Sequence, residues 1–256
     1  MRILLSILLF IISNSEVYSQ SIDLINWRKD TMPTGDRIYS ANQSNDNWIF
    51  KRESNSISVI QKQNSRIRGD TIKFNNPLID SLLKERKGFK IFKRIEFGYI
   101  VALNQGEFGG SLYFIAEQPS ASYLITSGVN IREFFELGSK LFAIEGLHHS
   151  SAPEGKILEI YKDTTWKFRV VKNLNDIPYL VSKIKDHYLI LTSGNLQILS
   201  PDLGLTQILK APFDWKFLYP SDLYVENDDI YIGMRKGVLQ IKSYQTTPIF
   251  YWFVPK

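Results

Sequence analysis

Short hydrophobic runs separated by polar turns repeat along most of the chain. Runs rich in Ile, Val, Leu, Tyr, Phe and Trp alternate with clusters of Gly, Asn, Asp, Ser and Pro. Because β-branched and aromatic residues favour strands and small polar residues favour turns, this alternation predicts an all-β fold. The strands expected from it lie at 47–51, 99–103, 111–116, 140–145, 156–161, 187–192, 196–200, 229–233 and 237–241.

Helical periodicity is confined to two short segments. In 76–88, Asn76 can cap a helix, Pro77 suits its first position, and Gly88 can end it. A weaker helical pattern covers 130–137. Both are therefore predicted as short helices within a β protein.

Four β-hairpins share one plan and begin at intervals of roughly 42 to 47 residues, the spacing of four-stranded propeller blades. Their strand pairs are 99–101 with 112–114, 141–143 with 157–160, 188–190 with 196–199, and 230–232 with 238–241. A more divergent unit pairs 48–50 with 57–60. The chain is thus predicted to form a β-propeller-like ring of about five repeat units. An irregular β-sandwich is the alternative, because its strands alternate in the same way.

The two ends of the chain carry strand-like runs that have no other obvious partner. The segments 23–28 and 249–254 are predicted to pair, which closes the ring and removes two exposed sheet edges. The aromatic residues Tyr251, Trp252 and Phe253 then become part of the core. In the third unit, 165–171 alternates apolar with polar residues, as a half-buried outer strand does.

Residues 1–19 have the features of a cleavable signal peptide. Met1 and Arg2 precede an apolar run at 3–12, and small residues follow before Gln20, where cleavage is expected. As a helix the apolar run is about 15 Å long, half of a hydrocarbon core of about 30 Å. The expectation is a secreted or periplasmic single domain at 20–256, monomeric and without a membrane span.

Composition narrows the class of partner. The chain has 31 Lys and Arg, 26 Asp and Glu, and no cysteine, so it has no disulfide framework. A basic secreted protein can meet acidic glycans, anionic lipids or an acidic protein, although the excess charge also simply aids solubility. Nucleic acid is not expected as a partner of an exported protein.

One stretch concentrates the positive charge. It consists of Lys84, Arg86, Lys87, Lys90, Lys93 and Arg94, beginning on the predicted helix and continuing into the next strand. A polyanion or acidic-protein site is one interpretation. The other is a solvated helix end, where Lys and Arg are favourable.

At the level of architecture the chain resembles secreted bacterial β-propeller-type proteins. It lacks the Trp-Asp dipeptide repeat, the kelch double-glycine period and a calcium-loop signature. The resemblance therefore implies a fold but assigns no family and no functional residue.

Two polar loops follow equivalent strands in successive units. The first contains Asn104, Gln105 and Glu107 among glycines and can bind a ligand or form a wide hairpin turn. The second contains Glu145 with His148 and His149. If the units are blades, both loops lie at one face of the ring. Adjacent histidines in a strand point in different directions, so no metal site or cofactor is predicted.

These features favour a non-catalytic binding protein that engages a protein or glycan partner through loops on one face. An inhibitor or immunity-type protein is one form of this role. The alternative is a carbohydrate-active or metal-assisted hydrolase or lyase that uses the weak catalytic candidates Glu107, Glu145 and His148. The chain has no Gly-x-Ser-x-Gly motif and no cysteine nucleophile, so catalysis is the less favoured interpretation.

Overall fold

The part of the chain that the structure describes folds into five β-sheets. The computed structural model describes residues 22–53, 56–62, 66–85, 87–149 and 152–256, without the side chains at 148–149 and 152–154. The expected signal peptide lies outside the described residues. Within those ranges, no helix has the length and apolar character needed to cross a membrane.

The sheets are numbered I to V in chain order, and each strand is given in its order across the sheet. Sheet I contains β1 (Ile22–Asp23), β4 (Ile57–Gln61) and β3 (Trp48–Arg52). Sheet II contains β5 (Ile67–Gly69), β6 (Phe89–Ile95), β7 (Gly98–Asn104), β8 (Gly110–Ala116) and β9 (Tyr123–Ser127). Sheet III contains β10 (Ile131–Leu137), β11 (Lys140–His149), β12 (Ala152–Lys162) and β13 (Trp166–Leu174). Sheet IV contains β14 (Pro178–Ile184), β15 (His187–Thr192), β16 (Asn195–Leu199) and β17 (Leu205–Lys210). Sheet V contains β18 (Asp222–Glu226), β19 (Asp229–Gly233), β20 (Val238–Lys242), β21 (Ile249–Pro255) and β2 (Trp27–Asp30).

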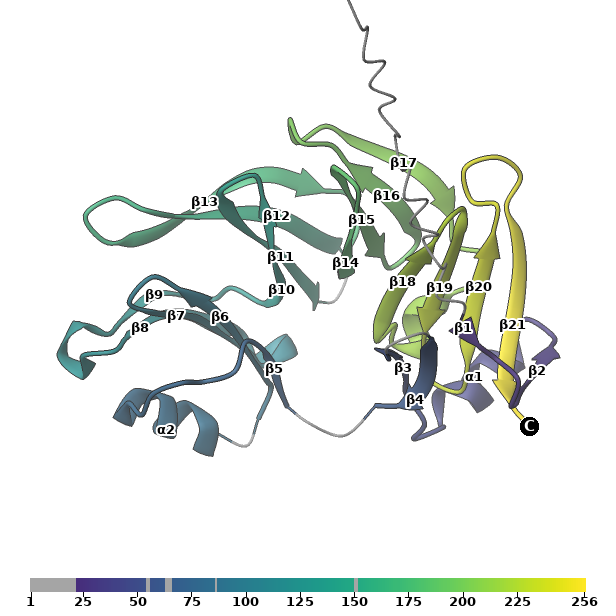
Figure 1. Cartoon of the computed structure of the whole chain (residues 1–256), viewed down its shortest axis with the longest axis horizontal. Coiled ribbons are helices and arrows are strands. Elements are labelled where there is room, and N and C mark those ends of the chain that lie inside the picture. The colour runs from purple at the N-terminus through teal and green to yellow at the C-terminus, as the bar shows by residue number, and fades with distance from the viewer. Residues whose placement is uncertain (1–21, 54–55, 63–65, 86, 150–151) are drawn as a thin grey trace, which may run out of the picture.

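The predicted repeat is confirmed, because each expected hairpin lies within its own sheet. The pairs Phe50–Val59, Val101–Tyr113, Leu141–Ile160, Tyr188–Leu199 and Ile230–Ile241 stand opposite each other in the five sheets. Five sheets around a common centre form a propeller-like fold rather than a two-layered sandwich (Figure 1).

Neighbouring sheets meet through their inner strands and through apolar side chains. Strand β10 contacts β6 and β14, and β18 contacts β14 and β3, so the sheets follow one another in the order II, III, IV, V, I. Fully buried pairs fill the junctions, for example Ile100 with Leu158 between II and III and Ile144 with Ile190 between III and IV. Burial of such side chains stabilises the fold by about 1.5 to 3 kcal/mol each.

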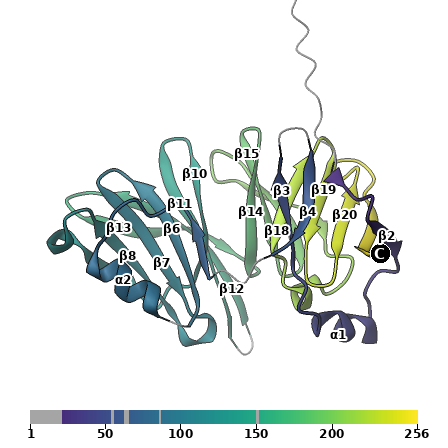
Figure 2. The same ribbon diagram turned by 60° about the horizontal axis from the view of Figure 1, so that its bottom comes forward.

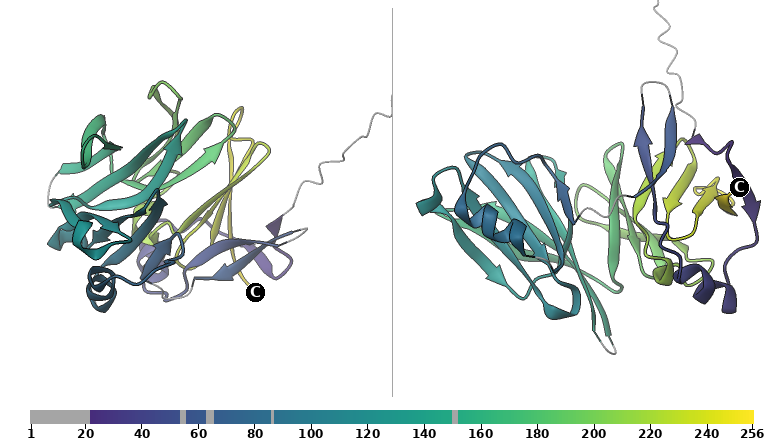
Figure 3. Two further views of the ribbon diagram at one scale, coloured as in Figure 1. Left: turned by 60° about the vertical axis from the view of Figure 1, so that its left-hand side comes forward. Right: turned by 90° about the horizontal axis from the view of Figure 1, so that it is seen from below.

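Helix α2 (Pro77–Lys84) covers the face of sheet II opposite to the one that packs against sheet III, as the views in Figure 3 show. Its Ile79 and Leu82 pack against Phe92 and Tyr99. The helix begins where the sequence predicted, with the Asn76 side chain accepting a hydrogen bond from the Leu78 N–H at 2.9 Å. It ends before Gly88, because the backbone is already extended at Glu85.

The two ends of the chain pair in sheet V, as predicted, but with a different register. Strand β2 runs antiparallel to β21 from Trp27 opposite Pro255 to Asp30 opposite Trp252. The segment expected to pair was 23–28, but Asp23 instead pairs with β4 in sheet I. The indole of Trp252 is buried, as the pairing requires.

The second predicted helix is wrong, because 131–137 forms strand β10. Its apolar residues Ile131, Phe134 and Phe135 have helical spacing, but β11 satisfies its backbone from Ile131 to Leu137. A helix that the sequence did not predict, α1 (Asp36–Asn42), buries Ile38 and Ala41 in the core of sheets IV and V.

Candidate binding site

The predicted polar loops share one face of the molecule. We call this face, where the inner strands β10, β14 and β18 begin, the loop face, and the opposite one the turn face. Because neighbouring strands are antiparallel, β7, β11, β15 and β19 end on the loop face. In Figure 2 this face is at the bottom, with α1.

The loop after β7 is held by its own polar groups. Asn104 Nδ2 donates to the Ile131 carbonyl at 2.8 Å, and Asn104 Oδ1 accepts from the Gly106 N–H at 3.0 Å. Gln105 precedes the 3₁₀ turn η1 (Gly106–Phe108), and its N–H donates to the Gly109 carbonyl at 2.9 Å. Asn104 thus joins sheets II and III, whereas Glu107 is exposed to solvent.

Strand β11 contacts η1, so the structure brings the two predicted loop regions together. The carboxylate of Glu145 is buried, and its Oε1 accepts from the Asn130 N–H at 3.4 Å. His148 and His149 end β11, and their side chains lie outside the described residues. Within the part of the chain that is described, no three His, Asp or Glu side chains form a metal-binding group.

The basic stretch is divided among several environments. Lys93 pairs with Glu136 at 2.8 Å, Arg94 pairs with Glu117 at 2.7 Å, and buried Lys90 donates to the Glu85 carbonyl. The Lys87 ammonium lies 5.6 Å from the centre of the Phe108 ring. Lys84 ends α2, and Arg86 lies outside the described residues.

A cluster of partly buried polar side chains surrounds the centre of the loop face. We call it the axial cluster, and it contains Lys62, Arg68, Arg132, Glu133, Tyr179 and Asp222. Every sheet contributes, because these residues lie within three positions of the start of β5, β10, β14 or β18, or directly after β4. No sequence pattern connects these residues, because they are scattered over 160 positions. All of them except Lys62 share one signal, a polar side chain near the start of a strand.

The two carboxylates of the cluster join neighbouring inner strands. Glu133 Oε2 accepts from the Val181 N–H at 3.2 Å, across sheets III and IV. Asp222 Oδ2 accepts from the Phe50 N–H at 2.8 Å, across sheets V and I. These bonds place both carboxylates in fixed positions at the centre.

Arg132 is held from two sides. Its Nε donates to the Gly146 carbonyl at 3.2 Å, and its guanidinium lies 5.0 Å from the centre of the Tyr179 ring. The hydrogen bond lies within sheet III, and the cation–π interaction joins sheet III to sheet IV. Arg132 is therefore presented in a defined orientation.

Burial shifts the protonation equilibria of the cluster toward neutral forms. It raises the pKa of Glu133 to about 7 and lowers the pKa of Lys62 to about 8, the latter with help from the Arg68 charge. Burial also raises the pKa of Asp222. Three cations face two carboxylates, so the cluster has an excess of positive charge that grows as Glu133 takes up a proton. Shifts of this kind gather at functional sites, although structural networks also produce them.

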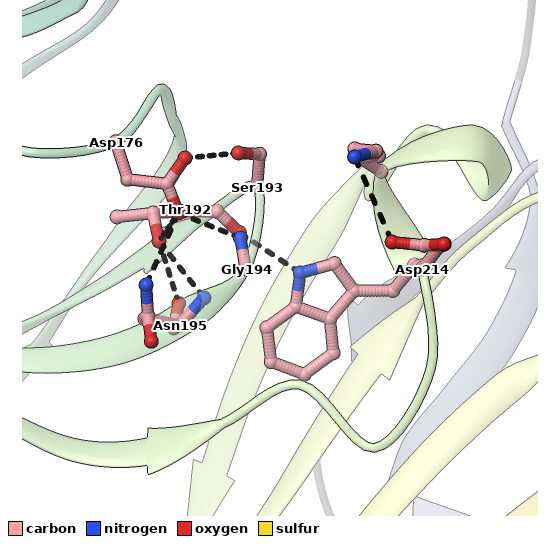
Figure 4. Close-up of polar contacts among 8 residues, drawn as sticks. Asp176, Thr192, Ser193, Gly194, Asn195 and Asp214 are labelled. Atoms are coloured by element: carbon pink, nitrogen blue, oxygen red, sulfur yellow. Dashed lines mark hydrogen bonds and ion pairs between the residues drawn. The ribbon is translucent and has the colours of Figure 1, made fainter. Parts of the chain in front are cut away.

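A hydrogen-bonded lock fixes the start of β14, which carries Tyr179. Figure 4 shows the Asp176 carboxylate accepting from the turn after β15. Its donors are the N–H groups of Ile177 and Gly194, the hydroxyls of Thr192 and Ser193, and the amide of Asn195. Burial opposes ionisation of Asp176, but these bonds outweigh it and lower the pKa. The lock holds an ionised carboxylate and serves a structural role.

Exposed aromatic side chains also lie on the loop face, on α1 and around η3. Tyr39 of α1 is 61% exposed, and its ring centre lies 6.4 Å from that of Phe217 in η3 (Trp215–Leu218). Tyr219 is 51% exposed, with the Arg235 guanidinium 4.3 Å from its ring centre. Aromatic residues and Arg are the types enriched at protein interfaces.

Comparisons with known proteins give no family. No family model matches the chain, and no curated protein matches it. A solved structure of a streptogramin B lyase is similar to it, with a TM-score of 0.36 and 8% sequence identity over 89% of this chain and 87% of the lyase chain. The fold assignment above rests on the strand pairing.

Proposed function

We propose that this chain is a non-catalytic binding protein that takes an acidic segment of another protein at the centre of its loop face. The observation that carries the proposal is the axial cluster. Its carboxylates are engaged by backbone N–H groups, and its three cations converge on the same centre. Charges that are partly desolvated attract an opposite charge more strongly than exposed ones do.

The surroundings of the cluster favour a protein as the partner. The exposed Tyr39, Phe217 and Tyr219 supply apolar area on the same face. A central charged contact with aromatic side chains around it is the usual composition of an energetic hot spot in a protein interface.

The test is recovery of a partner from the medium or periplasm of the native host by the tagged protein. The double variant Lys62→Gln and Tyr219→Ala should lose the partner, whereas Val170→Ala, an exposed residue of outer strand β13, should retain it. Recovery should also fall when salt is raised, because salt screens exposed charges. A partner recovered equally by the double variant, or no specific partner at native expression, would contradict the proposal.

Acid–base chemistry is the second candidate, on a different residue from those that the sequence suggested. Glu133, with a pKa of about 7, is half ionised at neutral pH, which is the condition for a general acid or base. Metal content after purification without chelator, together with a panel of glycan substrates, separates this candidate from binding. A metal-free protein that leaves the whole panel intact would exclude it.

A further inference from the structure

A pocket of about 540 Å³ lies on the turn face, between sheets II and III. The β6–β7, β10–β11 and β12–β13 turns surround it. Buried Leu141 and Ile160 form its apolar floor. Its volume lies within the range of about 300 to 1,000 Å³ that small-molecule sites occupy. The axial cluster is at the other end of the inner strands, so this pocket is a separate feature.

Two aromatic side chains of the pocket are held in place by their neighbours. The ring of Trp166 lies 6.3 Å from that of Phe114, and the backbone N–H of Trp166 donates to the Tyr123 hydroxyl at 2.5 Å. Tyr161 carries the Arg169 guanidinium 5.5 Å from its ring centre. A ligand therefore meets fixed aromatic surfaces and loses little to rearrangement of the site.

The polar lining has equal numbers of cations and carboxylates. The cations are Arg94, Lys140 and Lys162, and the carboxylates are Glu96, Glu136 and Glu159. Glu159 is buried, and its Oε2 accepts from Arg169 at 2.6 and 2.8 Å while Lys140 lies 3.4 Å from Oε1. The pocket therefore offers donors and acceptors in a fixed arrangement without selecting for a net charge.

We propose that this pocket binds a neutral carbohydrate of one or two rings. Sugar hydroxyls both donate and accept hydrogen bonds, which matches a lining of ammonium, guanidinium and carboxylate groups. The C–H face of a sugar ring stacks on aromatic rings, which Trp166 and Tyr161 supply. Arg94 is already paired with Glu117 and Lys140 with Glu159, so the pocket has no excess charge that would favour a charged ligand. This site is additional to the binding function proposed for the loop face.

Indole N–H signals in nuclear magnetic resonance provide the test, because the chain has only five tryptophans. The Trp166 signal is assigned by its loss in Trp166→Phe. The probes are glucose, galactose, N-acetylglucosamine and their β-linked disaccharides, each at about 10 mM, a concentration that detects affinities near 1 mM. At least one probe should shift the Trp166 signal in a saturable way.

Two variants at exposed residues of the pocket lining test whether the carbohydrate binds in this pocket. Lys162→Ala and Glu136→Ala change exposed side chains, so the protein should remain folded, and each should weaken the affinity by about tenfold through the loss of a charged hydrogen bond. Tyr219→Ala on the loop face should leave it unchanged. The proposal is overturned if no probe shifts the Trp166 signal, or if both pocket variants bind with unaltered affinity. Neither result affects recovery of a protein partner by the loop face.

Discussion

The substitution Glu133→Gln separates the charge of the axial cluster from its hydrogen bond. A glutamine retains the oxygen that accepts from the Val181 N–H but does not ionise. Burial raises the pKa of Glu133 from 4.5 to about 7, so the folded protein holds this proton more tightly than the unfolded chain does. At about 1.36 kcal/mol per pKa unit, ionisation of the buried group lowers the free energy of unfolding by about 3 kcal/mol.

The raised pKa of Glu133 determines the pH range in which the wild type loses stability. At low pH the carboxyl is protonated in both states and has no effect of this kind. As pH rises from about 4.5 to about 7, the unfolded chain releases the proton first and the wild type loses stability. Glu133→Gln has no such loss of stability. Its free energy of unfolding relative to the wild type should therefore increase by about 2 kcal/mol between about pH 5.5 and about pH 8.5.

Urea denaturation at the two pH values, followed by tryptophan fluorescence, measures this difference. For a chain of this size about 2 kcal/mol corresponds to roughly 4 to 8 °C in melting temperature, which gives a second readout. Glu136→Gln is the matched control on the same strand, since Glu136 is exposed and paired with Lys93. It should change stability by less than about 1 kcal/mol. An advantage of Glu133→Gln that is equal at both pH values would refute the reasoning.

Four further predictions concern the architecture of the fold and the export of the chain. Asp176→Ala should lower the free energy of unfolding by about 3 kcal/mol or more in denaturant titrations, because five donors lose one buried acceptor. Trp252→Ala should cost about 3 to 5 kcal/mol and Ile249→Ala, at an exposed position, under about 1. Deletion of the residues after Thr247 should unfold or aggregate the domain, and an unchanged melting temperature would argue against the role given to β21. Mass spectrometry of exported protein should find Gln20 at its N-terminus, and intact 1–19 would disprove the signal peptide.

The local part of the fold could be predicted from the sequence, because hairpins leave a local pattern. The segments 188–190 and 196–199 form a hairpin as predicted, and Tyr188 stands opposite Leu199 because alternation and a short turn fix the register. The segment 131–137 was mistaken for a helix because its apolar spacing suits both structures. Only the neighbouring strand β11, which satisfies its backbone, decides between them.

The candidate site could be predicted only in part. Because equivalent loops of repeated units lie on the same face, the repeat alone predicts that Asn104 and Glu107 lie on the loop face. The buried state of Glu145 was not, because it depends on how β11 packs against sheets II and IV. The axial cluster has no local pattern, because Lys62 and Asp222, 160 positions apart, come close only where sheets I and V pack together.

The pairing of the chain ends has a kinetic consequence. The Lys256 ammonium donates to the carbonyl of Ile25, 231 positions away, at 2.6 Å. Closing so long a loop costs more entropy than closing a hairpin, so β2 should dock on β21 last. Until then β21 has an unpaired edge that accepts any strand of matching register. A second copy can supply its own β2 at that moment, and exchange of this strand is the route by which refolding at high concentration should yield intertwined dimers.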